Sequence, residues 1–186
     1  MNLVDEFCTA NEPKEEPMAD VAPTVSWQLP SDGCYKVNTD GAVFSNSKQA
    51  GAGVIIRDGA REVVAALSKK WNYPLGAIKA EAKAVEAGII FAHDVGIRDA
   101  EVETNSLEIF NALRGHSAPP SSVVNVVTEI LNQASLLRKW KFTHIKRQGN
   151  VPAHVLAQHA KNVEDYLAWV EECPNVVEHV CAQDRL

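Results

Sequence analysis

The sequence lacks three features that would assign it to a well-marked class. No apolar run approaches the roughly 18 residues that a membrane-spanning helix needs, so a membrane protein is not expected. The four cysteines are scattered without a Cys-x-x-Cys pair, which argues against a zinc site and against a disulfide framework. No Gly-x-Gly-x-x-Gly or phosphate-loop pattern is present, so no nucleotide cofactor is expected.

The N-terminus lacks the basic and then apolar residues of a secretory signal and is acidic instead. Together with unpaired cysteines, this predicts an intracellular protein of the cytoplasm or the nucleus, without a signal peptide or a transmembrane segment. The 186 residues fit one domain with tails, and an apolar content of 46% is enough for a core.

Positive charge is in deficit overall, with 18 Lys and Arg against 24 Asp and Glu and a net charge of −6. The deficit lies at the two ends of the chain. Residues 1–32 carry seven acids and one base, and residues 163–186 carry six acids and one base. Residues 33–162 therefore retain 11 acids and 16 bases, a net charge of +5, and a phosphate backbone would respond to this local field.

Hydrophobic patterning predicts one α/β domain with the element order βββαβααβα. Residues 1–26 are rich in Pro, Glu, Ala and Asp and are expected to be disordered, whereas residues 27–175 form the domain and residues 176–186 a C-terminal tail. The Asp58-Gly59 pair between two β-branched runs indicates a hairpin. Strands are expected at residues 35–40, 53–57, 63–68, 100–104 and 140–146, and helices at residues 78–95, 106–114, 121–137 and 152–163.

Four polar residues are candidates for chemistry, and each also has a plainer interpretation. Asp40 closes the first strand at a rim of the sheet, although Asp-Gly is also a common turn dipeptide. Glu81 lies on the helical stripe expected to face the sheet, but the first turn of a helix also favours acids. Asn105 is a good N-cap, with Glu108 three residues on as in a capping box. His154, near the start of the last helix, is a solvated or capping residue more often than a ligand.

Residues 137–150 carry five bases and no acid, namely Arg138, Lys139, Lys141, Lys146 and Arg147. Aromatic side chains alternate with these bases. One interpretation is an edge strand that positive charge protects from aggregation. The other is a surface that follows a phosphate backbone and stacks bases.

Five short motifs occur in order on matching elements: Val-Asn-Thr-Asp-Gly-Ala at 37–42, Gly-Ala-Gly-Val-Ile-Ile-Arg-Asp at 51–58, Ala-Glu-Ala-Lys-Ala at 80–84, Glu-Thr-Asn-Ser at 103–106 and Asn-Val-Pro-Ala-His-Val-Leu-Ala at 150–157. Together they resemble the type 1 ribonuclease H domain, in the retrotransposon-derived, reverse-transcriptase-like branch abundant in plants. The resemblance implies a ribonuclease H-like fold, with a five-stranded mixed sheet flanked by helices.

The resemblance places the four catalytic positions of the family on Asp40, Glu81, Asn105 and His154, and the metal ligands on Asp40, Glu81 and Asn105. Family members hold two Mg²⁺ ions about 4 Å apart with a cluster of acids and so hydrolyse a phosphodiester. Here an amide and an imidazole replace two carboxylates, so four formal negative charges fall to two. Mg²⁺ or Mn²⁺ is the expected cofactor, with one ion or none as the alternative, since imidazole is a poor Mg²⁺ ligand.

The resemblance also implies nucleic-acid contacts from six residues: Asn38, Gly41, Ser106, Lys146, Arg147 and Asn150. Three functions stay open. The first is a metal-dependent endonuclease on RNA–DNA hybrids, with a degenerate site that is weak or inactive. The second is a non-catalytic module that binds a hybrid, a structured RNA or a protein, and the third is a purely structural protein.

Overall fold

The computed structural model describes residues 26–184, so the predicted disorder of residues 1–26 lies, except for Ser26, outside the described residues. A six-stranded mixed sheet runs in the order β5-β4-β1-β2-β3-β6. Strands β1, β4 and β5 are parallel, whereas β1, β2, β3 and β6 are antiparallel neighbours. The strands are β1 (Tyr35–Phe44), β2 (Gln49–Arg57), β3 (Val63–Trp71), β4 (Asp99–Thr104), β5 (Lys139–His144) and β6 (Tyr166–Val170).

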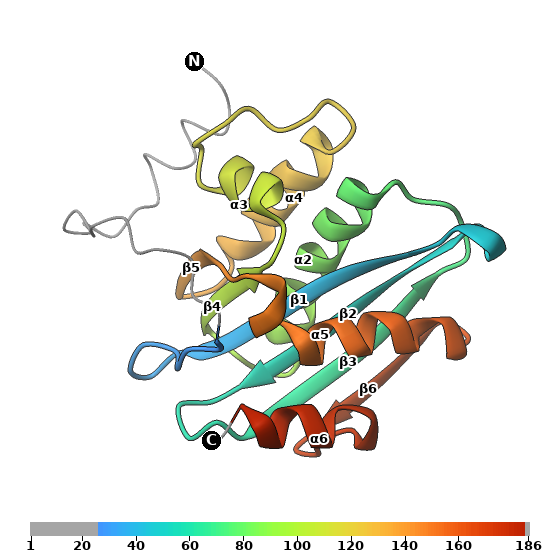
Figure 1. Cartoon of the computed structure of the whole chain (residues 1–186). Helices are drawn as coiled ribbons and strands as arrows, with labels where there is room; N and C mark the ends of the chain where they lie inside the picture. The colour runs from blue at the N-terminus through green and yellow to red at the C-terminus, as the bar shows by residue number, and fades with distance from the viewer. Residues whose placement is uncertain (1–25, 185–186) are drawn as a thin grey trace.

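Helices cover both faces of this sheet (Figure 1). On one side lie α2 (Ala77–Asp94), α3 (Leu107–Leu113) and α4 (Val124–Ala134), and on the other lie α5 (Val151–His159) and α6 (Asn175–Gln183). Within residues 26–184, three short 3-10 helices lie in the connections: η1 (Ser45–Ser47) between β1 and β2, η2 (Arg147–Gly149) between β5 and α5, and η3 (Ala160–Asn162) between α5 and β6. Val54 and Ile56 of β2 belong to the larger core under α2, whereas Ile55 between them belongs to the smaller core under α5. Because successive side chains of a strand point to opposite faces of the sheet, β2 contributes to both cores.

Two glycines allow the helices to approach the central strands. A Cβ atom at Gly41 would lie 2.6 Å from the carbonyl carbon of Ala80, at the start of α2. A Cβ atom at Gly53 would lie 2.1 Å from the carbonyl oxygen of Ala153 in α5. Both contacts involve backbone atoms, which cannot move aside as a side chain could. The two helices therefore sit close against β1 and β2 only because these positions have no side chain.

The fold departs from the sequence-based expectation at the C-terminal end. The sheet has a sixth strand, β6, which pairs with β3, rather than five strands. The segment expected to be a tail forms α6, where Val177 and Cys181 are buried against the smaller core. Most of β6 is solvent-exposed, so its side chains do not alternate between apolar and polar in the way that identifies a half-buried strand.

Polar side chains on β1 and β4 lie buried beneath the segment that precedes β1. Lys36, Asn38, Glu101 and Glu103 are each no more than 3% exposed. The indole N–H of Trp27 donates to Asn38 Oδ1 at 2.9 Å, and further along the backbone N–H of Ser31 donates to Glu101 at 2.7 Å. Because this cover comes from outside the sheet, the polar face of β1 is internal rather than solvated.

No helix within residues 26–184 has both the length and the apolar character that crossing a membrane would require.

Candidate active site

Asp40 lies inside β1, opposite Gly53 of β2, and the strand continues to Phe44. The interpretation of Asp40-Gly41 as a turn, and the expected strand end at residue 40, are therefore wrong. The pairing of β1 with β4 ends one residue earlier, at Thr39 and Thr104. Asp40 is thus the first residue of β1 beyond the carboxyl end of its parallel neighbour, where open sheets of this kind place their ligands.

The Asp40 carboxylate is buried and in contact with α5. Its exposed fraction is 2%, and its Oδ2 atom lies 2.7 Å from His154 Nδ1. Burial raises the pKa of Asp40 above its usual value, although a hydrogen bond and positive charge from His154, the charge of Arg147 and a hydrogen bond with Asn105 oppose the rise. Histidine and asparagine, from separate elements, therefore meet the same carboxylate.

Glu81, in the first turns of α2, lies beside Asp40. The backbone N–H of Gly41 donates to Glu81 Oε2 at 3.1 Å. Burial, and then the negative charge of Asp40, raise the pKa of Glu81 to about 8, against the opposing effects of the Gly41 hydrogen bond and the charge of Arg147. Two carboxylates in one partly desolvated place repel each other, and the positive charge of Arg147 compensates for this repulsion only in part.

Asn105 reaches the same place because it does not cap a helix. Ser106 is the N-cap of α3, and its Oγ accepts a hydrogen bond from the backbone N–H of Ile109 at 3.4 Å. The capping interpretation of Asn105 is therefore wrong by one residue. The side chain of Asn105 instead accepts a hydrogen bond from Asn150 Nδ2 at 3.4 Å and contacts Asp40.

Two basic residues border the site at the start of η2, with Lys146 as its N-cap and Arg147 as its first residue. Arg147 Nη2 lies 3.4 Å from His154 Nε2, and its charge lowers the pKa of both carboxyl groups. Lys146 and Arg147 are exposed. A cavity of about 220 Å³ opens here between Arg147, Gln148, Val151 and His154. Gln148 and Val151 were missed by the sequence analysis, although they flank Gly149-Asn150 at the edge of a quoted motif.

The predicted nucleic-acid contacts separate into accessible and buried residues. Asn38 and Asn150 are each 1% exposed, so these two predictions are corrected. Asn38 donates to Glu103 at 2.7 Å, and Asn150 donates to the carbonyl oxygen of Thr39 at 2.9 Å. Their amides therefore tie the scaffold together. Gly41 uses its N–H on Glu81, and Ser106 is partly buried.

The bases of residues 137–150 also differ in whether an acid pairs with them. Arg138, just before β5, forms an ion pair with Asp99, and Lys141 of β5 forms one with Glu101 of β4 at 2.8 Å. These two bases neutralise acids of the neighbouring strand, which could not be inferred from a stretch that itself contains no acid. The bases near the site are therefore Lys146 and Arg147.

The donor set at this point suits one hard cation better than two. Asp40, Glu81 and Asn105 offer oxygen atoms, but only two of them carry a negative charge, and His154 offers nitrogen. Within the described residues 26–184, no group of three or more His, Cys, Asp or Glu side chains is arranged to hold a metal ion. Two adjacent dications would keep most of their mutual repulsion, so the residues do not fit a two-ion centre.

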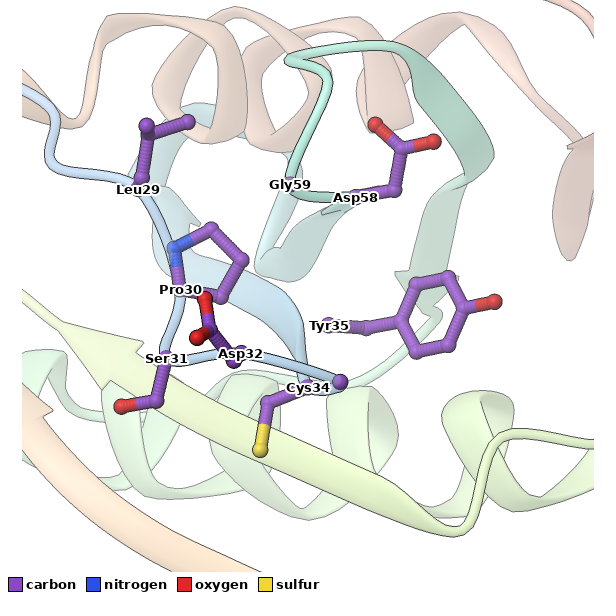
Figure 2. Close-up of a pocket in the computed structure, with 9 residues that line it drawn as sticks. Leu29, Pro30, Ser31, Asp32, Cys34, Tyr35, Asp58 and Gly59 are labelled. Atoms are coloured by element: carbon purple, nitrogen blue, oxygen red, sulfur yellow. The ribbon is translucent and has the colours of Figure 1, made fainter.

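A second hollow of about 260 Å³ lies at the beginning of β1, between residues 29–35 and the β2–β3 turn at Asp58 and Gly59 (Figure 2). Its ionisable side chains are the acids Asp32 and Asp58, together with Cys34 and Tyr35. An acidic lining without a base does not suit a phosphate group. The hollow therefore adds nothing to the nucleic-acid site.

Comparison with known proteins places this arrangement in context. Residues 38–160 match the family model described as reverse transcriptase-like. A candidate ribonuclease H protein of Arabidopsis thaliana is 28% identical over 168 residues, which cover 87% of this chain and 26% of that protein. The chain thus spans about a quarter of the length of the curated relative that it matches.

Solved structures share the fold. Ribonuclease H1 of the archaeon Halobacterium salinarum superposes with a TM-score of 0.66 at 24% identity, covering 70% of this chain and 98% of that one. The LC11 ribonuclease H1 from compost, solved in complex with an RNA/DNA hybrid, gives 0.58 at 21% identity, covering 69% and 96%. The predicted ribonuclease H-like fold is confirmed, with one strand more than expected.

Proposed function

The chain belongs to the reverse transcriptase-like family and has a ribonuclease H-like fold, and on this premise we propose a nucleic-acid-binding domain with a degenerate hydrolytic site. The preferred ligand is an RNA–DNA hybrid, as in the LC11 relative. One observation carries the proposal: Asp40 meets His154 at 2.7 Å and also contacts Asn105. Apart from Glu81, the neighbours of the Asp40 carboxylate are thus an imidazole and an amide, where a two-ion centre requires further acids.

A single Mg²⁺ or Mn²⁺ would be held by Asp40, Glu81 and the amide oxygen of Asn105. When bound, such an ion would neutralise charge on a phosphate oxygen. His154 competes with it, because its Nδ1 atom already occupies Asp40 Oδ2. Glu81 is the one other carboxylate beside Asp40, so a bound ion would have two negatively charged ligands in place of four. We therefore propose slow cleavage or none.

Binding of the nucleic acid would depend on the bases at the rim. Lys146 and Arg147 are exposed beside the two carboxyl groups, and Arg147 also faces the cavity lined by His154. Each phosphate contact releases condensed counterions, so affinity would fall with salt. Since Arg138 and Lys141 are engaged by acids of β4, they contribute less than the sequence suggested.

The proposed domain extends from Trp27 to Asp184. Both ends meet at Arg57, whose guanidinium stacks 3.9 Å from the centre of the Trp27 ring and pairs with Asp184 at 2.6 Å. Arg57 is 1% exposed, so both contacts are internal to the folded unit. Removal of residues 176–186 would leave this buried charge unpaired.

The test is cleavage of a labelled RNA–DNA hybrid in Mg²⁺ and in Mn²⁺. We expect little product from the wild type, and a gain of about 100-fold from the double variant Asn105→Asp/His154→Asp, because two further carboxylates supply several kcal/mol of charge stabilisation to a pair of ions. The single variant Asn105→Asp should gain less.

Asn132→Asp, on the exposed surface of α4, is the matched control and should change nothing. Rapid cleavage by the wild type would refute the degenerate site. Absence of any gain in the double variant would mean that these four positions do not form a metal centre. Titration of the hybrid at two salt concentrations tests binding separately: Lys146→Ala/Arg147→Ala should lower the salt slope by about 2.

A further inference from the structure

Strand β6 forms one outer edge of the sheet in the described part of the chain (Figure 1). The backbone N–H of Lys70 donates to the carbonyl of Asp165 at 2.6 Å, and that of Glu171 donates to Val64 at 2.8 Å. Antiparallel strands alternate their hydrogen-bonding direction residue by residue. The odd-numbered residues of β6 therefore bond to β3, while the backbone groups of Tyr166, Ala168 and Val170 point to the open side.

The side chains of this edge are apolar and accessible. Tyr166, Leu167 and Val170 are 62%, 43% and 56% exposed. The strand is nevertheless held firmly, because Trp169 packs against the smaller core that contains Val177 of α6. An open, apolar, well-supported edge is a template for a further strand, and isolated proteins normally protect such edges.

Acidic residues stand at both ends of β6. Glu164 and Asp165 precede the strand, Glu171 and Glu172 follow it, and all four are exposed. Antiparallel pairing with a second copy, centred on Ala168, would place Asp165 opposite Glu171 and Glu164 opposite Glu172. Like charges opposite each other destabilise a strand pair. The acids therefore disfavour a dimer through this edge and favour a strand with basic ends.

We propose that β6 is a docking edge for an extended polypeptide segment of a partner protein, with alternating apolar residues at its centre and Lys or Arg at both ends. The partner strand would bond to the open backbone groups of Tyr166, Ala168 and Val170, which is the β-augmentation mode of recognition. Its basic ends would meet Glu164, Asp165, Glu171 and Glu172. This surface is separate from Asp40 and Glu81, so the inference does not depend on the proposed function.

The probe is the synthetic peptide Lys-Lys-Val-Thr-Val-Thr-Val-Lys-Lys, with Glu in place of every Lys in the control peptide. We expect the full chain to bind the basic peptide at least about 10-fold more tightly than the acidic one, with a difference that shrinks in high salt. In amide hydrogen exchange, the amides of Tyr166, Ala168 and Val170 should gain protection. Equal affinity for the two peptides, or protection elsewhere, would overturn the proposal.

Two variants locate the binding. Ala168→Pro removes an N–H that faces the open side and leaves the bonds to β3 intact, as proline on an edge strand can. It should weaken binding of the basic peptide by about 10-fold. Glu164→Lys/Glu172→Lys leaves one acid beside one base at each end of β6, so it should abolish the preference for the basic peptide, whereas Lys139→Glu on the opposite edge strand should not. Unchanged preference after the charge reversal, or dimerisation through β6, would contradict the proposal.

Discussion

Buried carboxylates behave in opposite ways at two places on the same sheet. Asp40 on β1 is 2% exposed and Glu101 on β4 is 3% exposed. Burial raises the pKa of Asp40, and the pKa of Glu81 beside it rises to about 8. Burial acts on Glu101 as well, but hydrogen bonds from Lys141, Lys36 and Ser31 outweigh it and lower the pKa to about 2.

The two places differ in the cations near the carboxylates and not in how far Asp40 and Glu101 are buried. Glu101 and Glu103 with their lysines are called the compensated set, and Asp40 with Glu81 the uncompensated set. Lys36 Nζ lies 2.8 Å from Glu101 and 3.5 Å from Glu103, so two neighbouring strands neutralise each other. Around Asp40 and Glu81 the compensation is incomplete, with His154 on one oxygen and Arg147 at the rim. Perturbed, uncompensated groups collect at functional sites, whereas a satisfied network stabilises the fold. The proposed function assigns the uncompensated set to chemistry or binding, and the ion pairs of the compensated set hold β1 and β4 together.

The largest effect is expected from removing a cation of the compensated set. Lys36→Met leaves Glu101 and Glu103 buried with too little positive charge, which should lower the free energy of unfolding by about 3–5 kcal/mol. Urea denaturation at pH 7 measures it. Lys139→Met on the exposed part of β5 is the control and should stay within about 0.5 kcal/mol of the wild type. Equal unfolding midpoints for both variants would erase the contrast between the two regions.

A smaller effect of opposite sign is expected at the uncompensated set. Between pH 4.5 and about 8 the unfolded chain has lost the Glu81 proton that the folded chain retains, so the stability of the wild type falls as pH rises. Glu81→Gln should therefore stabilise the protein, by about 2 kcal/mol at pH 8 once solvent screening is allowed for, and by less at pH 5.

Thermal and urea denaturation at the two pH values test this gain, with the exposed Glu172→Gln as control. Loss of stability in Glu81→Gln at pH 8 would mean that Glu81 is already compensated, and the two regions would then not differ.

The smallest expected effect is on the pH dependence of the free energy of unfolding at acid pH. Because the folded pKa of Glu101 is depressed to about 2 from 4.5, its contribution to stability is complete above pH 4.5 and is lost as pH falls through about 2. Glu101→Gln should be less stable at pH 7, and its difference from the wild type should shrink between pH 4.5 and 2. A constant difference across that interval would place the effect of Glu101 elsewhere than in its charge.

Much of the fold follows from the sequence, since the order of the first five strands and the four helices from α2 to α5 agrees with the hydrophobic pattern. The element β6 was missed because its exposed side chains carry no alternation. The packing of α6 was missed because it depends on contacts with distant residues, such as the pair between Asp184 and Arg57. The hydrophobic pattern of a short segment does not show which distant residues that segment will pack against.

The site was predicted in part. The motifs identified Asp40, Glu81, Asn105 and His154 as residues that meet, and their side chains do approach one another. Their roles in metal binding and catalysis stay predictions. Asn38 and Asn150 were assigned to nucleic-acid contacts by the family resemblance, whereas here Trp27 donates a hydrogen bond to Asn38 and Asn150 donates one to the carbonyl oxygen of Thr39. The N-cap of α3 is Ser106, one residue after Asn105, the predicted N-cap.

The most direct measurement is a carboxyl ¹³C NMR titration that follows Glu81 and Glu101 in the same sample. The account predicts that Glu81 titrates near pH 8 and Glu101 near pH 2, and that Mg²⁺ lowers the Glu81 value by supplying the missing positive charge. If both groups titrate near 4.5, the contrast between a compensated and an uncompensated set of carboxylates is contradicted.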